Sequence, residues 1–137
     1  MRKINIYHGT RYLFPTHVND MLLPREQAES IEAFLVVIQP GMSTHRHAHA
    51  DTEQLYYVVS GEGRAALANP DGSLEESPLL PNDLLHIPRN TIHQIFCTGT
   101  QPLRYLCVDA FPSGKPHGEP TWDHHYRAVI RQQGDLK

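Results

Sequence analysis

Cysteine is scarce in this chain, because only Cys97 and Cys107 occur among its 137 residues. Two cysteines exclude a disulfide framework and a zinc cluster held by thiolates. Long apolar runs are also missing, since no segment approaches the roughly 20 apolar residues of a membrane-spanning helix. The N-terminal segment has basic residues but no apolar stretch of signal-peptide length. We therefore predict a reduced, cytoplasmic protein that has no membrane partner.

A strong excess of one charge sign is absent as well. The chain has 12 Lys and Arg against 15 Asp and Glu, for a net charge of −3, and the two signs are interspersed. No basic stripe indicates a nucleic-acid partner, so none is expected. Phosphate loops, dinucleotide fingerprints and nucleophile elbows are also missing. The length fits one domain, residues 1–137, with a core of useful size.

Helical patterns are few, whereas turn residues are frequent, with 11 Pro and 9 Gly. Between the turns lie short runs rich in β-branched and aromatic residues. Many short strands with regular turns are typical of a β-sandwich or β-barrel. We therefore predict an all-β fold. The expected strands cover residues 33–39, 55–59, 64–68, 84–87, 93–98 and 103–111.

The best helical pattern lies near the C-terminus, over residues 121–132. Thr121 can cap its start and Gly134 can stop it. We expect this amphipathic helix to pack on the outside of the barrel or on a partner subunit. A second, weaker pattern of a turn or two covers residues 25–31. The apolar stripe of the C-terminal helix comprises Trp122, Tyr126, Val129 and Ile130.

Histidine, by contrast, is abundant, with ten in the chain. His45, His47 and His49 alternate along one short stretch, and His93 stands far downstream. Residues two apart in an extended segment point to the same face. Neutral imidazole is a common ligand of zinc, iron, copper and nickel. The pattern therefore predicts a metal site built from His47, His49 and His93.

Two spacing patterns surround these histidines. In the first, five residues separate Gly41 from His47, one residue separates His47 from His49, and a strand then leads to Gly61. The second resembles the pattern G-x5-P-x-G-x2-H-x3-N. It starts at position 82, covers Pro88 and His93, and ends at position 97.

These two patterns resemble the two motifs of the cupin family, and the match covers residues 41–97 directly. The family is built on small β-barrels of the jelly-roll type, so the resemblance implies a double-stranded β-helix. Asn82 and Asn90 stand where the family has glycine, and Cys97 where it has asparagine. Because asparagine tolerates the left-handed backbone conformation better than other residues after glycine, the two asparagine replacements are mild.

The family pattern also calls for a fourth, acidic ligand, for which two residues compete. Glu53 satisfies the loose spacing after His49, but the six residues that the pattern places between the ligand and Gly61 put Gln54 at the ligand position. The second spacing lies within a strand and cannot slip without reversing faces, whereas the first lies in a turn. We therefore favour Gln54, and Glu53 stays open as the alternative. Some cupins that this chain resembles use a His-His-Gln-His set, and Glu53 then accepts a histidine N–H instead.

Tyr56 and His45 are the candidate catalytic residues. Tyr56 shares a strand face with Gln54, so it either places a phenol over the substrate or packs in the core. His45 has the parity of His47 and is a proton shuttle, a ligand in an alternative register, or a residue at the barrel mouth without a role. Cys97 faces the interior as a metal-tuning thiol or a small apolar filler. Arg64 and Arg104 are candidates to hold a carboxylate.

The resemblance implies a metal-dependent enzyme acting on a small molecule. Neutral ligands suit Fe²⁺ or Mn²⁺ for oxygen chemistry and Zn²⁺ or Ni²⁺ for Lewis-acid chemistry. We favour an iron-dependent oxidoreductase of the dioxygenase type. The alternatives are a metal-dependent isomerase, lyase or decarboxylase, and a non-enzymatic barrel that binds a metal and a metabolite.

Two further expectations concern partners. Four neutral ligands leave the ion's charge uncompensated within walls expected to be apolar, namely Val58, Ile95 and Cys97. An anionic substrate would offset that charge. The open edges of a small barrel need cover, which predicts a homodimer to which the stripe of the C-terminal helix contributes.

Overall fold

The computed structural model describes residues 1–135, and most of its regular structure is antiparallel β-sheet. Strands that pair in sequence order are joined by short turns, as alternating apolar patterns and frequent Gly and Pro predict. A single α-helix, α1 (Trp122–Asp135), and one turn of 3-10 helix, η1 (Arg25–Gln27), complete the described structure. The strands are β1 (Thr10–Leu13), β2 (Val18–Leu23), β3 (Ile31–Ile38), β4 (Glu53–Ser60), β5 (Gly63–Ala68), β6 (Leu74–Leu79), β7 (Leu84–Ile87), β8 (His93–Cys97) and β9 (Leu103–Ala110).

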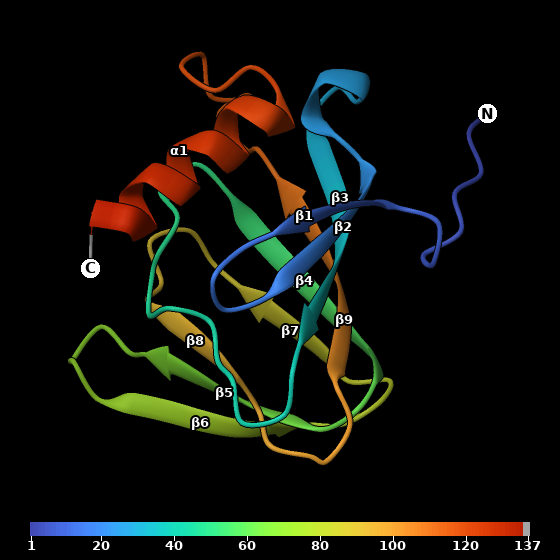
Figure 1. Cartoon of the computed structure of the whole chain (residues 1–137). Helices are drawn as coiled ribbons and strands as arrows, with labels where there is room; N and C mark the ends of the chain where they lie inside the picture. Colours follow the sequence, from blue (N-terminus) through green and yellow to red (C-terminus); the bar gives the residue numbers. More distant parts are fainter. Residues whose placement is uncertain (136–137) are drawn as a thin grey trace.

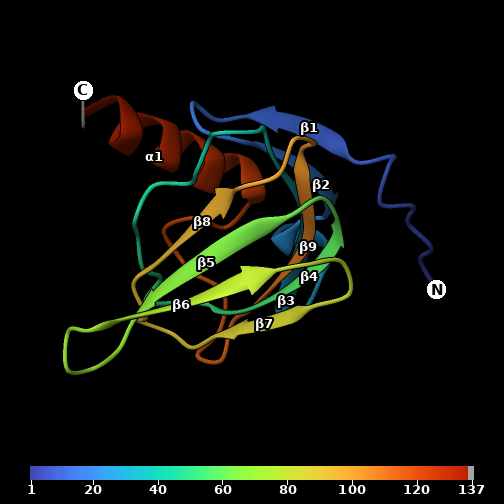
Figure 2. The same ribbon diagram turned by 90° about the horizontal axis from the view of Figure 1, so that it is seen from below.

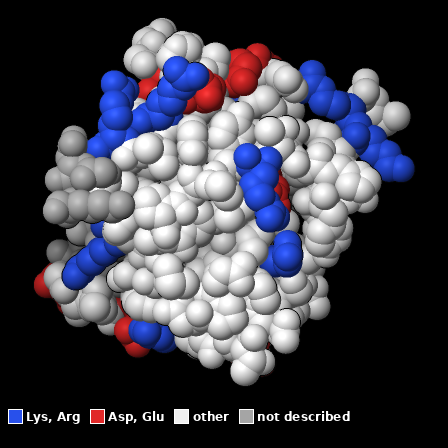
Figure 3. Space-filling model, viewed as in Figure 1, with Lys and Arg blue, Asp and Glu red and all other residues white. Residues whose placement is uncertain are grey.

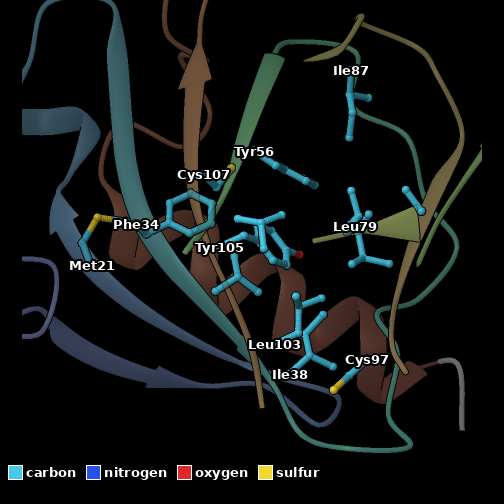
Figure 4. Packing of buried hydrophobic residues seen from close by; sticks show 14 of the residues in the cluster. Met21, Phe34, Ile38, Tyr56, Leu79, Ile87, Cys97, Leu103, Tyr105 and Cys107 are labelled. Carbon is cyan, nitrogen blue, oxygen red and sulfur yellow. The ribbon is translucent and has the colours of Figure 1, made fainter. Parts of the chain in front are cut away.

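The strands form two sheets that enclose one core (Figures 1 and 2). The larger sheet has six strands in the order β1-β2-β3-β9-β4-β7, and the smaller has three in the order β6-β5-β8. Both sheets contribute to a single apolar cluster, with Tyr56 and Leu103 from the larger one and Leu79 and Cys97 from the smaller (Figure 4). The predicted all-β jelly-roll class with a short C-terminal helix is confirmed.

All six predicted strands are present, and β7 has the predicted bounds. Three strands were not predicted: β1, β2 and β6. In β6 every residue but Leu79 is exposed, so no apolar alternation marks it. Pro78 also lowers its strand propensity, and the structure tolerates this proline because β6 is an edge strand. In β2 a bulge between Met21 and Leu23 interrupts the two-residue period.

The two asparagines that replace family glycines adopt the conformation expected of them. Asn82 has φ of 76° and Asn90 has φ of 63°, both in the left-handed region. Gly61 retains its glycine for two reasons. Its φ is 81°, and a Cβ atom there would collide with the backbone of Pro102.

Helix α1 begins where predicted, because the Thr121 hydroxyl accepts the His124 amide at 3.2 Å. The predicted stop at Gly134 is wrong, since the helix continues through this residue to Asp135, the last residue described. The weak pattern over residues 25–31 yields only η1, because β3 already begins at Ile31.

Helix α1 packs on its own chain, across one end of the strands (Figure 1). Trp122 is 2% exposed and belongs to the main core cluster. Tyr126 stacks edge-on against Tyr12 and Phe14, with centroids 5.0 and 5.1 Å away. The unpredicted β1–β2 hairpin therefore covers much of the apolar stripe.

Charges are dispersed on the surface seen in Figure 3. Lysines and arginines there are separated by uncharged surface, and they form no continuous basic stripe on that face. Within the described residues, no helix is long and apolar enough to cross a membrane.

Candidate metal centre

The loop between β3 and β4 brings two of the predicted histidines against β8. His47 and His93 exchange two backbone hydrogen bonds, with N···O distances of 3.1 and 2.8 Å. Beyond this bridge, the His49 carbonyl accepts the Asn90 amide at 2.7 Å. The side chains of His47, His49 and His93 then converge, so that one ring nitrogen from each lies within 4.8 Å of the others. Two neighbouring histidines of the loop and the distant His93 thus form one cluster.

Backbone carbonyls fix the orientation of two of these rings. His47 Nδ1 lies 2.6 Å from the His45 carbonyl, and His93 Nδ1 lies 2.8 Å from the Thr91 carbonyl. A carbonyl only accepts, so both rings carry their proton on Nδ1 and leave the Nε2 lone pair free. This is the tautomer that a metal ion requires.

Burial keeps the three imidazoles neutral. It lowers the pKa of His49 to about 3 and that of His93 to about 4, and neighbouring imidazoles add to both shifts. Burial likewise lowers the pKa of His47. Neutral rings with free lone pairs within 4.8 Å of one another fit a divalent transition-metal ion.

Gln54 is buried beside this cluster, with 4% of its surface exposed. Its Nε2 donates to Asp109 Oδ1 at 2.8 Å, and its Oε1 accepts the Tyr56 hydroxyl at 2.9 Å. The same hydroxyl lies 3.4 Å from His93 Nε2. The amide oxygen of Gln54 therefore faces the histidine side. That Gln54 serves as a ligand stays a prediction.

Glu53 points the other way, as strand parity requires. It is exposed on the outer face of β4, where its Oε2 lies 2.6 Å from His86 Nε2 of the neighbouring strand β7. The suggestion that Glu53 accepts the N–H of a metal-binding histidine is therefore wrong. The carbonyls of His45 and Thr91 have that role.

The remaining candidates are spread over the molecule. His45 is exposed at the rim of the cavity and lies outside the three-histidine cluster. Cys97 is a buried core residue that lies toward Leu103, away from Tyr56 (Figure 4). Arg64 pairs with Glu76 on the outside of the small sheet, and Arg104 lines a different depression. Neither arginine lines the histidine cavity.

The histidines open into a cavity of about 270 Å³. The larger sheet forms one wall, the histidine loop another, and α1 closes over it. The three residues expected in its walls, Val58, Ile95 and Cys97, do not line it, because they belong to the core. The polar residues that line it are His17, Asn19, Thr44, His45, Arg46, His47, His49, Gln54, Tyr56, Tyr105, Asp109, Trp122, His125, Gln132 and Gln133.

A buried polar row behind Gln54 was missed at the sequence level. Asp109 of β9 pairs with Gln54 on one side and with Glu32 of β3 on the other. Glu32 receives a two-pronged ion pair from Arg25, with N···O distances of 2.8 and 3.0 Å. Strand parity gives a signal for Asp109, because it shares the inward face of β9 with Tyr105 and Cys107.

This row holds an extra proton. Burial and the neighbouring Asp109 together raise the pKa of Glu32 to about 8, although Arg25 acts to lower it. The Glu32 carboxyl therefore holds a proton at neutral pH, beside Asp109 and Arg25. The row is then electrically neutral, which is the cheapest state for a buried group.

The comparisons with known proteins identify the family of this chain. The family model described as "Cupin domain" matches residues 34–109, more than half of the chain. Glucose-6-phosphate isomerase of Thermococcus onnurineus is 28% identical over 68% of this chain and 49% of its own length. Auxin-binding protein T92 of Nicotiana tabacum is 31% identical over 74% of this chain and 57% of its own length. The chain spans about half the length of these relatives.

Solved structures show the same fold. Lactobacillus farciminis oxalate decarboxylase superposes with a TM-score of 0.68 at 25% identity, covering 77% of this chain and 32% of that one. Bacillus subtilis oxalate decarboxylase superposes with a TM-score of 0.70 at 15% identity, covering 82% of this chain and 30% of that one, and its manganese centres are described as Mn(II). With the family match, the two motifs and the convergent histidines, this chain belongs to the cupin family.

Proposed function

We propose that this protein is a metal-dependent cupin enzyme acting on a small anionic molecule. The observation that carries the proposal is the convergence of His47, His49 and His93 on one point, with the Nδ1 atoms of His47 and His93 held by backbone carbonyls. These three residues and Gln54 would hold one divalent ion, with Fe²⁺ or Mn²⁺ favoured over Zn²⁺ or Ni²⁺. Such an ion would supply Lewis-acid or redox chemistry at the inner end of the cavity.

The chain's own residues then orient the site and hold protons. Asp109 accepts from the Gln54 amide nitrogen, which turns the amide oxygen toward the histidines. Tyr56 has its pKa raised well above 10 by burial, so its phenol stays protonated and acts as a donor, not as a base. His45 at the rim is our candidate for exchanging protons with solvent, because it is exposed and close in sequence to the ligands.

An anionic substrate suits the charge balance of this donor set. Three neutral imidazoles and a neutral amide would leave the ion's charge uncompensated by its ligands. Arg46 adds a positive group to the lining, while the Asp109 charge is engaged behind Gln54. The names of several relatives point the same way, since oxalate and glucose 6-phosphate are both anions.

Two reaction classes remain to be separated by assay. The dioxygenase-type oxidation favoured from the sequence consumes oxygen. The isomerase and decarboxylase alternatives do not, and relatives carry names of both those reactions. We therefore propose to measure oxygen uptake, carbon dioxide release and aldose–ketose interconversion on one panel of small carboxylic and keto acids and sugar phosphates.

Metal binding is the first test of the proposal. The protein is stripped with a chelator, reloaded with one ion at a time and analysed for metal per chain. We expect about one ion per chain for the wild type and less than a tenth of that for His93→Ala. His86→Ala is the matched control, because His86 is an exposed histidine outside the cluster. Full metal content in His93→Ala would contradict the site.

A non-enzymatic binding function is the second candidate, supported by the likeness to an auxin-binding protein. Binding alone would give affinity for a small acid without turnover. Matched pairs of a carboxylic acid and its amide, titrated into metal-loaded and metal-free protein, test the shared anion preference. Equal affinity for both members of every pair would show that metal charge does not govern recognition.

We also propose a homodimer, although not through the stripe on α1, which the chain covers itself. The outer face of β4 and the edge strand β7 offers Leu55, Tyr57 and Leu84, which are 41, 40 and 63% exposed. Light scattering at tens of micromolar tests this, and a monomer there would contradict it.

A further inference from the structure

Three buried polar atoms around the cavity have no hydrogen-bond partner among the described residues. They are Asn19 Oδ1, Trp122 Nε1 and Gln133 Oε1, and all three residues line the same cavity. Thr52 Oγ1 is the fourth such atom, and Thr52 lies outside that lining. Buried polar groups without partners are rare in folded proteins. Because three of them lie around one cavity, we infer that a molecule in the cavity supplies their hydrogen-bond partners.

Asn19 and Trp122 are the two strongest members of this set. Asn19 is 5% exposed and Trp122 is 2% exposed, so bulk water reaches neither side chain freely. Asn19 lies in β2 and pairs with Val36 of β3, which also lines the cavity. Trp122 is fixed at the start of α1 by its contacts with Phe34 and Tyr12, at centroid distances of 4.9 and 5.9 Å. Rigid groups in such a setting form a preorganised subsite.

Asn19 lies apart from Gln54 within the larger sheet. Gln54 lies in β4, and the sheet order β2-β3-β9-β4 places Asn19 three strands away. A ligand held at Gln54 therefore meets Asn19 with a different part of its structure.

The two side chains require opposite hydrogen-bonding partners on the ligand. An indole N–H only donates, so Trp122 requires an acceptor on the ligand. An amide oxygen only accepts, so Asn19 requires a donor. A hydroxyl group is both at once, whereas a carboxylate or phosphate cannot donate to Asn19. The cavity of about 270 Å³ equals roughly nine water molecules at liquid density, which limits the ligand to a small one.

We propose that Asn19 and Trp122 form a hydroxyl-binding subsite, so that this cavity selects small hydroxy acids over the corresponding plain acids. The acid end would be taken by the metal site, and to that extent the inference rests on the proposed function. The hydroxyl preference belongs to a separate set of residues and is measured separately.

The test compares matched ligands on matched variants. Calorimetry gives Kd for ω-hydroxy acids of three to six carbons and for the parent acids, on manganese-loaded protein. The preference is expressed as the ratio of the Kd of the parent acid to that of its hydroxy acid. The corresponding ratio of alkanol to diol is measured on metal-free protein, so that it does not depend on the metal. At one chain length the wild type should prefer the hydroxylated member roughly tenfold, the effect of one to two buried hydrogen bonds.

Two cavity variants and one control locate this preference. Asn19→Leu and Trp122→Phe should each bring the ratio close to one. Asn19→Leu should also raise the melting temperature of the free protein, because it removes an unpaired buried acceptor. Thr52→Val removes an unpaired hydroxyl outside the cavity lining and should keep the wild-type ratio.

The outcomes separate the two proposals. A wild-type ratio near one in both ligand series, or an undiminished ratio in Asn19→Leu, would overturn the subsite and would mean that water satisfies these atoms. Acids that bind equally with and without manganese would overturn the role of the metal in anion binding. A hydroxyl preference that persists in the diol series would still support the subsite in that case.

Discussion

The two ends of the same strands have opposite chemistry. Along the inward face of β8, His93 is followed by Ile95 and Cys97, and along β4 Gln54 is followed by Tyr56 and Val58. On β9 the order is reversed, from Leu103 and Tyr105 through Cys107 to Asp109. Because β9 runs antiparallel to β4, its polar residue meets the polar residue of β4: Asp109 pairs with Gln54. One end is therefore an apolar core, and the other is a cavity with many polar side chains in its lining.

This comparison separates the residues that stabilise the fold from those that serve the site. At the apolar end, Val58 and Leu103 are fully buried and Ile95 is 1% exposed, and each removes apolar surface from water. At the cavity end, equally buried positions hold His93, Gln54, Asp109 and Glu32. Burying polar groups costs free energy unless they are paired. Burial at the cavity end therefore stabilises the fold less than burial at the apolar end does.

The largest predicted effect lies at the apolar end. Leu103→Ala should lower the free energy of unfolding by about 2–5 kcal/mol, because it leaves a cavity in a closely packed core. Urea denaturation of the metal-free protein measures this. Leu74→Ala is the control, since Leu74 is 53% exposed on β6, and it should cost less than about 0.5 kcal/mol. Metal content per folded chain should be unchanged in both variants. A lower metal content in Leu103→Ala would show that the apolar end also supports metal binding.

The next effect concerns the fourth ligand. Gln54→Ala should weaken metal binding by roughly 10- to 100-fold, whereas Glu53→Ala should change it by less than twofold. The two residues are neighbours in sequence, but only Gln54 is buried beside His93. Competition with a chromophoric chelator measures the affinity. The reverse ranking would show that Glu53 reaches the ion, and a refined structure of the metal-loaded protein would then place its oxygen on the metal.

Sequence reasoning succeeded where the signal was local. Strand parity and a fixed distance to Gly61 separated Gln54 from Glu53 in orientation, and the two asparagines at positive φ followed from backbone preference alone. The row from Arg25 to Asp109 was missed because it depends on which strands pair. Glu32, Asp109 and Gln54 come from three strands, and only the register of β3, β9 and β4 brings them together.

The packing of α1 and of the β1–β2 hairpin over the cavity was missed for a related reason. The apolar stripe of α1 indicates that the helix packs on something, but amphipathicity does not identify the surface. The β1–β2 hairpin, which supplies Tyr12 and Asn19, carries too weak a strand pattern to predict. The polar subsite of Asn19 and Trp122 therefore could not be foreseen, although the histidine cluster opposite it was.

A pH effect of intermediate size tests the buried carboxyl pair. The pKa of Glu32 rises from 4.5 to about 8 on folding, so the folded chain binds more protons than the unfolded chain between these values. This contribution to stability is complete below about pH 4.5 and is lost as the pH rises through 8. Metal-free protein should lose up to about 1.4 kcal/mol per pH unit between pH 6.5 and 8.

The histidines do not contribute to the loss of stability between pH 6.5 and 8. Folding lowers the pKa of His17 and His93 to about 4, so their contribution rises with pH only up to the unfolded value of 6.5. Denaturant titrations at half-unit intervals from pH 6.5 to 8.5 measure the slope. Glu32→Gln should flatten it, and Glu29→Gln on the exposed segment before β3 should leave it intact. An unchanged slope in Glu32→Gln would mean that Glu32 is ionised beside Arg25 throughout.

The smallest predicted effect lies on the outer face of the cavity end, at the pair of Glu53 and His86. Their Oε2···Nε2 distance of 2.6 Å is short, but both side chains are about half exposed. Exposed ion pairs contribute 0–1 kcal/mol because water screens the charges and both side chains lose freedom. Glu53→Ala and His86→Ala should therefore each change the free energy of unfolding by less than about 1 kcal/mol. The double variant measures the coupling between them, and the same proteins are assayed for metal content. A larger coupling, or metal loss in either single variant, would extend the functional end of the molecule through β4 to its outer surface.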